Sequence, residues 1–172
     1  LSVGKEGDIL IVLKEVSCTF FDGFGGKGLF TAVSPLSVNF SDGGRYAIVG
    51  ESGSGKTTLA RMIAGLQRPS GGSVFVDGIP VYERKRAGKE HFRKVQIIQQ
   101  NSASALDPKI PVGKSIEEPL LCFFHMEREK RRERCRHLME LCNLPLDYYI
   151  RLPSELSGGE QKRVAIARAL AA

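Results

Sequence analysis

The eight residues from Gly50 to Thr57 constrain the fold of this chain more than any other feature of its sequence. They read Gly-Glu-Ser-Gly-Ser-Gly-Lys-Thr and satisfy the phosphate-loop pattern G-x-x-x-x-G-K-[ST]. The mostly apolar stretch Arg45–Val49 before them predicts a short strand, and the apolar spacing after Lys56 predicts a helix. A strand, a glycine-rich turn and a helix in this order predict an α/β fold built around a phosphate site.

Each residue type in this loop has a physical role in holding phosphate. Glycines let consecutive backbone N–H groups turn inward around an anion, which bulkier side chains would obstruct. The following helix adds the positive end of its dipole at the same point. Lys56 supplies a mobile positive charge for the β- and γ-phosphates, and the Thr57 hydroxyl is a hard oxygen ligand for Mg²⁺. The alternative, a glycine-rich turn with a chance Lys-Thr pair, leaves the flanking strand and helix unexplained.

The other elements predict a strand-rich first half and a mostly helical second half. Expected strands are Ile9–Val16, Val33–Phe40, Arg45–Val49, Ser73–Val76 and Val95–Ile98. A glycine-rich loop is expected at Asp22–Gly28, and Asp77-Gly78 predicts a hairpin turn. Expected helices are Lys85–Arg93, Arg128–Leu141 and Gly158–Ala171, with a proline-punctuated loop and a short helix after Asn101.

Composition indicates a globular chain with an anionic partner. Its 172 residues are 42% apolar, and the longest apolar runs, Ile9–Leu13 and Leu120–Phe124, are far too short to cross a bilayer. The net charge of +6 suits a nucleotide, a nucleic acid or the cytoplasmic face of a membrane. The basic run Arg128–Arg136 is interleaved with glutamates, and Glu127 stands four residues before Arg131. This pattern favours a solvated helix face over a nucleic-acid-binding stripe.

The four cysteines form no C-x-x-C pair, which indicates a reducing cytoplasm. One interpretation makes a zinc set of Cys122, His125, Cys135 and His137. Their spacing matches no structural zinc site, whereas Cys135, Leu138, Met139 and Cys142 form an i, i+3, i+4, i+7 stripe. An apolar helix face is therefore the better explanation.

A second glycine-containing helix start follows at Leu156-Ser157-Gly158-Gly159-Glu160. Ser157 and Glu160 fit the capping box S-x-x-E, which leaves the two glycines between them unexplained. Glycine in a helix costs about 0.8–1 kcal/mol relative to alanine. The glycines make sense if a ligand approaches the backbone closely, and a second phosphate at a helix N-terminus is such a ligand.

Together these motifs resemble the ATPase domain of ABC transporters. The resemblance runs from about Ile9 to Ala172, with Walker A at 50–57, a Q-loop glutamine at Gln100 and the LSGG signature at 156–159. It implies an α/β P-loop NTPase core with an N-terminal antiparallel β part and a helical subdomain. The implied nucleotide-binding core covers 9–100 and continues, incomplete, at 158–172. The helical subdomain then covers 101–157.

The resemblance also implies ligands and residue roles. ATP and Mg²⁺ are the implied cofactors, with Lys56 and Gln100 as catalytic residues and Thr57 and Gln100 as Mg²⁺ ligands. In this family an aromatic residue after the first strand stacks on adenine. Phe20 takes that position best and Phe21 second, and core packing is the alternative for both. The residues expected to contact nucleotide are Phe20, Gly50, Ser52, Gly53, Ser54, Gly55, Lys56, Thr57, Thr58, Ser157, Gly158 and Gly159.

The stretch Gln100–Pro108 resembles ATPases that serve dipeptide, oligopeptide and nickel importers, with Ser102 and Ala105 closer to the nickel branch. The departures from the family pattern are mild: Thr57 stands for the usual Ser, Glu160 for Gln, and Gln99 where an aromatic residue is common. The implied partners are a second ATP-binding subunit paired head-to-tail, permease subunits and, indirectly, a solute-binding protein. The implied location is cytoplasmic, on the inner face of the cell membrane. Leu120–Phe124 is either a docking patch for the permease or part of a buried core.

Two other functions compete with the importer interpretation. The first is a non-transport ABC ATPase acting on nucleic acid or on the ribosome. Only about 100 residues separate Lys56 from Ser157, without sustained heptads, so the long coiled coil of repair and chromosome members is absent from the sequence. The second is a nucleotide-binding module with a purely regulatory role. The importer interpretation is preferred, and no nucleic-acid partner is expected.

The Walker B pattern, four apolar residues followed by Asp-Glu, does not occur in these 172 residues. The nearest candidate, Val74-Phe75-Val76-Asp77, continues into Gly78 and favours the hairpin. In the family, Walker B follows the signature helix and supplies the carboxylate that polarises the attacking water. Because the chain also begins without Met, we expect it to be a piece of a longer sequence.

A polypeptide of these 172 residues should therefore hydrolyse ATP slowly. Loss of one positioned transition-state group costs about 10²–10³ in rate, and loss of a whole strand costs more. A steady-state phosphate-release assay on this polypeptide measures the rate. Turnover at the rate of an intact ABC ATPase would contradict the expectation.

Overall fold

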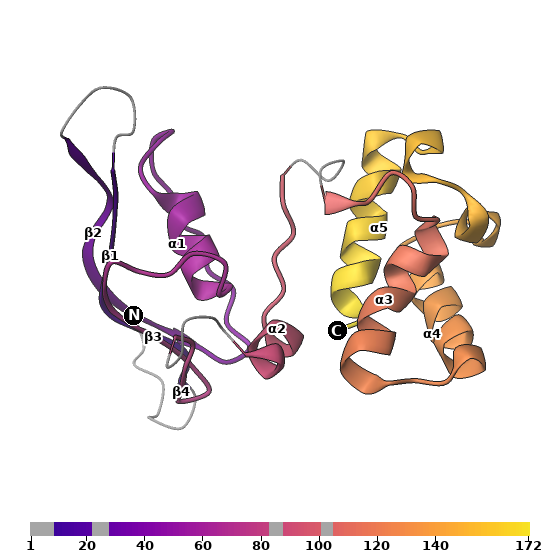
Figure 1. The fold of residues 1–172 in the computed structure, drawn as a ribbon, viewed down its shortest axis with the longest axis horizontal. Helices are drawn as coiled ribbons and strands as arrows, with labels where there is room; N and C mark the ends of the chain where they lie inside the picture. The colour runs from indigo at the N-terminus through magenta and orange to yellow at the C-terminus, as the bar shows by residue number, and fades with distance from the viewer. Residues whose placement is uncertain (1–8, 22–27, 83–87, 101–104) are drawn as a thin grey trace. The chain divides into compact units, whose positions relative to one another are not determined.

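The computed structural model describes residues 9–21, 28–82, 88–100 and 105–172, and the chain divides between Val95 and Gln96 into two compact units (Figure 1). Most of the expected Asp22–Gly28 loop, the beginning of the expected Lys85–Arg93 helix and the family-like stretch at Asn101–Ser104 lie outside the described residues.

The first unit contains a sheet in the order β2-β1-β3-β4, in which every neighbouring pair is antiparallel. Its strands are β1 (Ile9–Phe21), β2 (Leu29–Ser41), β3 (Gly71–Val76) and β4 (Ile79–Pro80). Three predicted strands are thus confirmed, each longer than expected. The predicted hairpin turn is also confirmed, because Asp77 and Gly78 have φ values of 49° and 71° and join β3 to β4.

Helix α1 (Lys56–Ile63) covers one face of this sheet. Its buried Leu59 and Met62 pack with Leu13, Val16 and other apolar residues of the strands. The Tyr82 hydroxyl donates to the carbonyls of Met62 and Gln67, at 2.8 and 2.7 Å, which fixes the chain at the end of α1. Burial raises the pKa of Tyr82 to about 12, so the phenol stays a donor at neutral pH.

Two predicted strands are wrong. Residues 45–49 and 95–98 pair with no other described strand, although both stretches are rich in apolar residues. A strand exists only through its ladder partners, and local apolar density does not supply them. As a result Tyr46, Ile48 and Val49 are 54%, 45% and 90% exposed. The expected helix at 85–93 is described only as α2 (Lys89–Lys94).

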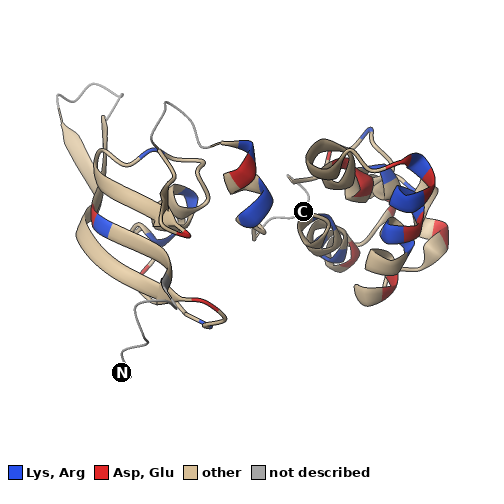
Figure 2. Ribbon diagram, turned by 90° about the horizontal axis from the view of Figure 1, so that it is seen from below, with Lys and Arg blue, Asp and Glu red and all other residues tan. Residues whose placement is uncertain are grey.

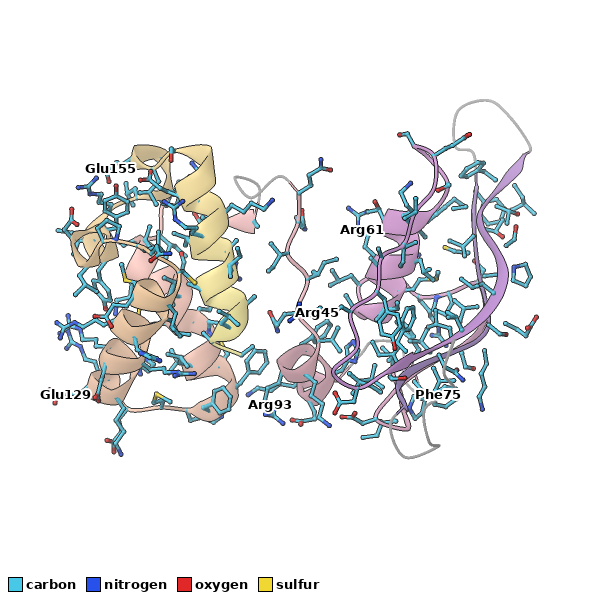
Figure 3. The ribbon with its side chains drawn as sticks, turned by 180° about the vertical axis from the view of Figure 1, so that it is seen from behind. Arg45, Arg61, Phe75, Arg93, Glu129 and Glu155 are labelled. Atoms are coloured by element: carbon cyan, nitrogen blue, oxygen red, sulfur yellow. The ribbon has the colours of Figure 1, made fainter. Side chains whose placement is uncertain are left out.

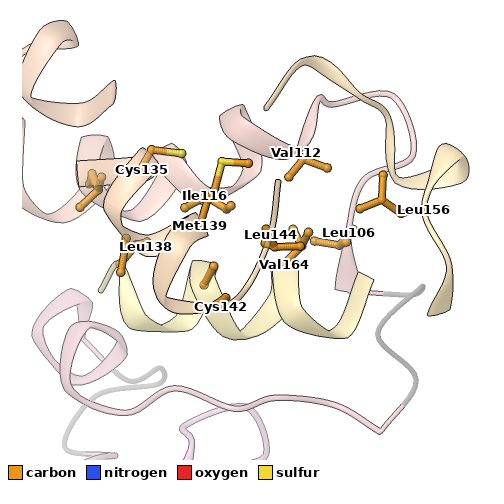
Figure 4. Close-up of a cluster of buried hydrophobic side chains, with 13 residues drawn as sticks. Leu106, Val112, Ile116, Cys135, Leu138, Met139, Cys142, Leu144, Leu156 and Val164 are labelled. Carbon is orange, nitrogen blue, oxygen red and sulfur yellow. The ribbon is translucent and has the colours of Figure 1, made fainter. Parts of the chain in front are cut away.

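The second unit is a helical bundle of α3 (Val112–Phe124), α4 (Arg128–Leu141) and α5 (Gly158–Leu170), with the short 3-10 helices η3 (Leu146–Ile150) and η4 (Pro153–Glu155). The bounds of α4 agree with the prediction, and α3 is longer than the short helix expected. The predicted stripe is confirmed, since Cys135, Leu138, Met139 and Cys142 are all buried in one apolar cluster (Figure 4).

The Leu120–Phe124 run was expected to be either a docking patch or part of a buried core, and the structure shows some of its residues buried and others exposed. Leu120 is 2% exposed and belongs to the core, whereas Leu121 and Phe124 are 50% and 45% exposed. Among the described residues, no helix combines the length and apolar character that crossing a bilayer requires. In the same part of the chain, no group of three or more His, Cys, Asp and Glu side chains is placed to bind a metal ion.

A buried carboxylate ties three elements of this unit together. Glu117 on α3 accepts a hydrogen bond from the Tyr149 hydroxyl at 2.5 Å and from Lys114 at 3.1 Å, and Arg131 of α4 lies 3.7 Å away. Burial alone would raise the pKa of Glu117, but the hydrogen bonds from Tyr149 and Lys114 outweigh it and the pKa is lowered.

Arg131 therefore turns inward, whereas the sequence predicted a pair with Glu127 on a solvated face. Glu127 instead lies 3.8 Å from Lys130. The rest of the predicted solvated face is confirmed, because Arg128, Arg132, Arg134 and Arg136 are exposed. Acidic and basic residues are mixed over the helices of this unit (Figure 2).

Gly113 should be indispensable to this packing. A Cβ at Gly113 would lie 2.1 Å from the Tyr149 ring. We expect Gly113→Ala to lower the free energy of unfolding by about 1–3 kcal/mol, the usual cost of overpacking. Urea unfolding measures it, with Gly158→Ala as the control because no atom lies within 4 Å of a Cβ there. Equal stability of Gly113→Ala and the unchanged chain would show that the Tyr149 ring is free to move.

Candidate nucleotide-binding site

The phosphate-loop residues form a compact turn between the sheet and α1. Gly53 and Gly55 have φ values of 83° and 84°, in the left-handed region that other residues rarely adopt. The backbone N–H of Ser54 donates to the carbonyl of Glu51 at 3.2 Å, and that of Leu59 donates to Gly55 at 2.9 Å. The first hydrogen bond closes a turn within the loop, and the second begins the helix directly after it.

Gly55 rests on the backbone of β2. A Cβ at this position would lie 2.1 Å from the carbonyl oxygen of Ala32. Ala32 is the extra residue of a β-bulge, because Cys18 pairs with Val33 and the next residue, Thr19, pairs with Thr31. A bulge in the sheet therefore carries the phosphate loop, and only glycine allows the two backbones to come so close.

Among the described residues, no side chain caps the N-terminus of α1. Its N-cap residue is Gly55, which has no side chain to accept a hydrogen bond, and the first turn contains no acidic residue. The first N–H groups of a helix need an acceptor and carry the positive end of its dipole. This end of α1 is therefore suited to receive an anion.

Lys56 lies across the loop. Its ammonium donates to the carbonyls of Gly50 at 2.8 Å and Glu51 at 2.5 Å, and to the hydroxyl of Ser54 at 3.2 Å. A Cβ at Gly50 would lie 2.8 Å from that hydroxyl oxygen, so this glycine also leaves room for the arrangement. The three oxygens hold the positive charge directly at the loop.

The remaining loop positions are accessible. Ser52, Gly53 and Thr57 are exposed, and Thr58 is half-buried at the first turn of α1. Uncapped N–H donors, a mobile ammonium and a hydroxyl oxygen are the groups that a Mg²⁺-bound triphosphate requires. The residues present fit such a ligand.

Phe20 and Phe21 stand at the free end of the β1–β2 hairpin, 38% and 86% exposed. Alternation along β1 places Phe20 on the face of the buried Cys18, the face that packs with α1. Across the hairpin their partners are Phe30 and Leu29, also exposed. The sequence predicted the two phenylalanines of β1 but missed this second pair, which only the strand register brings beside them.

The second glycine-containing helix start lies in the other unit, at the beginning of α5. Ser157 is its N-cap, and the predicted capping box is confirmed: Glu160 Oε2 accepts from the Ser157 N–H at 2.8 Å and its hydroxyl at 2.7 Å. Ser157, Gly158 and Gly159 are all exposed. Neither glycine has a positive φ, and a Cβ at Gly158 would meet no atom within 4 Å. Neither backbone conformation nor packing therefore requires a glycine at position 158.

Tyr148 also contacts the residues at the start of α5, which the sequence did not indicate. Its hydroxyl donates to Glu160 Oε1 at 2.9 Å. Hydrogen bonds from Ser157 and from Tyr148 lower the pKa of Glu160 to about 2, so its carboxylate is ionised at neutral pH. The connector before the helix is fixed as well, because Glu155 accepts from the Leu152 N–H at 2.6 Å (Figure 3).

Gln100, the expected Q-loop glutamine, is exposed in the described part of the chain. It belongs to the second unit, as do Ser157, Gly158 and Gly159, whereas the phosphate loop belongs to the first. The roles assigned to these residues stay predictions.

Comparison with known proteins identifies relatives that match most of this chain. The profile of the family described as ABC transporter matches residues 33–172. The nickel import ATP-binding protein NikE of Brucella suis biovar 1 (strain 1330) is 39% identical over 142 residues, 82% of this chain and 53% of the relative. The dipeptide transport ATP-binding protein DppF of Escherichia coli (strain K12) is 37% identical over 148 residues, 86% of this chain and 44% of the relative. The chain thus spans about half the length of these curated relatives.

Solved structures agree on the fold. A dimeric post-hydrolysis state of the ATP-binding cassette MJ0796, bound to ADP and Pi, has a TM-score of 0.83 and 30% identity over 94% of this chain and 69% of that one. CbiO1 from Clostridium perfringens, part of the transporter complex cbiONQ, has a TM-score of 0.72 at 21% identity over 95% of this chain and 62% of that one. The α/β fold predicted from the sequence is therefore confirmed.

Replacing Gly55 should damage both the loop and the sheet beneath it. Gly55→Ala adds a methyl group against the Ala32 carbonyl and a side chain in the left-handed region, which together cost on the order of 1–3 kcal/mol. Urea unfolding and calorimetric titration with ATP measure the two effects. Gly28→Ala is the control, because a Cβ there meets no atom of the described residues within 4 Å. A Gly55→Ala chain with unchanged stability and ATP affinity would contradict the close approach.

Proposed function

The chain belongs to the ABC transporter family, and on this basis we propose that it is the ATP-binding subunit of an importer of nickel or of di- and oligopeptides. In this proposal the subunit couples the binding and hydrolysis of ATP to uptake of the solute. The observation that carries the proposal is the uncapped N-terminus of α1, with the Lys56 ammonium held across the loop in front of it.

The triphosphate of ATP binds on this loop. Its oxygens replace the carbonyls that hold Lys56, and the first N–H groups of α1 gain the acceptors that Gly55 does not supply. Gly50, Ser52, Gly53, Ser54 and Gly55 provide the backbone around the phosphates, and Thr58 donates from the first turn. Adenine stacks on Phe20, at the open end of the hairpin, where the exposed phenyl ring offers an apolar face.

Mg²⁺ accompanies the nucleotide. Thr57 would supply a hydroxyl ligand to the ion, and Gln100 would supply an amide oxygen. The ion contributes charge neutralisation at the β- and γ-phosphates. Lys56 stabilises the negative charge that develops on the γ-phosphate, and Gln100 links the nucleotide to the helices of the second unit.

A second ATP-binding subunit completes the site. The two subunits pair head-to-tail, and Ser157, Gly158 and Gly159 of one subunit close over the ATP on the phosphate loop of the other. The exposed serine hydroxyl and the open space beside Gly158 support this role, because a phosphate can approach the backbone there without displacing a side chain. The dimeric state of the MJ0796 cassettes supports it further.

The remaining partners follow from the importer role. Permease subunits dock on the second unit, which places the protein on the cytoplasmic face of the cell membrane, and a solute-binding protein contributes indirectly. The names of the relatives support nickel or peptide as the solute, and the permease and binding protein select between them. The alternative, an ATPase acting on nucleic acid, has less support, since acidic and basic residues are mixed over the helices of the second unit. DNA or RNA binding that weakens steeply with salt would favour it.

Two substitutions separate nucleotide binding from pairing. Lys56→Ala removes a charge-assisted contact, so we expect ATP affinity to fall roughly 10- to 100-fold in a calorimetric titration. Gly158→Ala should bind ATP as the unchanged chain does, but a methyl group in the path of the phosphate should abolish ATP-dependent pairing in analytical ultracentrifugation. Unchanged ATP affinity of Lys56→Ala would overturn the nucleotide site, and normal pairing of Gly158→Ala would overturn the role of the signature.

A further inference from the structure

The two oxygens of Glu160 have different partners. Oε2 accepts both the N–H and the hydroxyl of Ser157, at 2.8 and 2.7 Å, whereas Oε1 accepts the Tyr148 hydroxyl, at 2.9 Å. Tyr148 comes from η3, an element separate from the helix that it contacts. Tyr148 lies outside the signature motif and contacts Glu160, and Glu160 in turn contacts Ser157 of the signature.

The hydroxyl hydrogen of Ser157 is committed in this arrangement. It points to Glu160, so Ser157 can donate to a phosphate only after its hydroxyl rotates away from the carboxylate. Glu160 then loses one of its donors while it remains ionised beside a second anion. The donors that stay with it are the Ser157 N–H and the Tyr148 hydroxyl.

We propose that Tyr148 is a positioning residue for Ser157, acting through Glu160: it keeps the carboxylate in place when the serine hydroxyl turns to the γ-phosphate bound on a partner copy. This inference rests on the proposed role of the signature in ATP-dependent pairing. It assigns to η3 a part in nucleotide recognition that neither the motif nor its spacing indicates.

The surroundings of Tyr148 fix the direction of its hydroxyl. The guanidinium of Arg151 lies 4.1 Å from the centre of the Tyr148 ring, and Asp147 accepts a hydrogen bond from Arg151 at 2.5 Å. The ring also packs against the apolar core of the second unit. The hydrogen bond to Glu160 raises the pKa of Tyr148, which keeps the phenol protonated, and Arg163 adds a positive charge near the carboxylate.

The adjacent tyrosine provides a matched control. Tyr149 belongs to the same 3-10 helix but donates to the buried Glu117 rather than to the signature helix. Tyr148→Phe and Tyr149→Phe therefore remove the same atom from neighbouring positions. Only the first should affect Ser157, and the second reports how far a loss of stability alone affects pairing.

The test is ATP-dependent pairing of the chain in analytical ultracentrifugation, with ATP affinity measured in parallel. We expect Tyr148→Phe to weaken pairing on the order of fivefold, as for the loss of one part-buried hydrogen bond that acts on Ser157 indirectly, without changing ATP affinity. Tyr149→Phe should pair like the unchanged chain once corrected for its folded fraction. In a Glu160→Ala background, Tyr148→Phe should have no further effect, because its route to Ser157 is gone.

The possible results are distinguishable. If the unchanged chain does not pair in ATP, the proposed function fails and the inference fails with it. If the unchanged chain pairs and Tyr148→Phe pairs equally well, the inference alone is overturned. An equal loss in Tyr149→Phe, or a loss that persists in the Glu160→Ala background, would show that Tyr148 acts only through stability and would also overturn it.

Discussion

The contact between Gly55 and the carbonyl of Ala32 fixes the position of the phosphate loop on the sheet. It joins a turn that requires glycine to a bulge that interrupts the β1–β2 ladder, so the loop and the sheet cannot shift independently. The contact also places the start of α1 beside the sheet with its N–H groups uncapped. The position of the ammonium of Lys56 follows, since the carbonyls that hold it belong to the same turn.

The two glycine-containing helix starts differ in whether a side chain of the protein caps their first N–H groups. The start of α1 has no side-chain acceptor and is incomplete until an anion binds. The start of α5 is already satisfied by Ser157 and Glu160, so an incoming phosphate has to compete with a bond that the protein makes to itself. In the proposed pairing, where the two ends share one triphosphate, the first end binds the nucleotide and the second responds to its binding.

The sequence predicted the features whose causes are local. The phosphate loop, the Asp77-Gly78 turn, the bounds of α4 and the Ser157 capping box all depend on residues within a few positions of one another. The predicted strands at 45–49 and 95–98 failed because strand formation depends on a partner that apolar density cannot reveal. The Ala32 bulge, the Phe30–Leu29 pair and Tyr148 were missed for the same reason, since each acquires its role from a distant segment. The sequence did not indicate Glu117 either, because its structural role depends on its burial and on contacts with Lys114, Arg131 and Tyr149.

The carboxylate of Glu117 has a mechanical consequence for the second unit. It joins α3 to α4 and to η3. Another residue of η3, Tyr148, donates a hydrogen bond to Glu160 at the start of α5. Four elements are thereby coupled, α4 through Arg131 and the other three through the two adjacent tyrosines. A displacement imposed at Ser157 would therefore reach α3 along these hydrogen bonds, through Glu160 and the two tyrosines to Glu117.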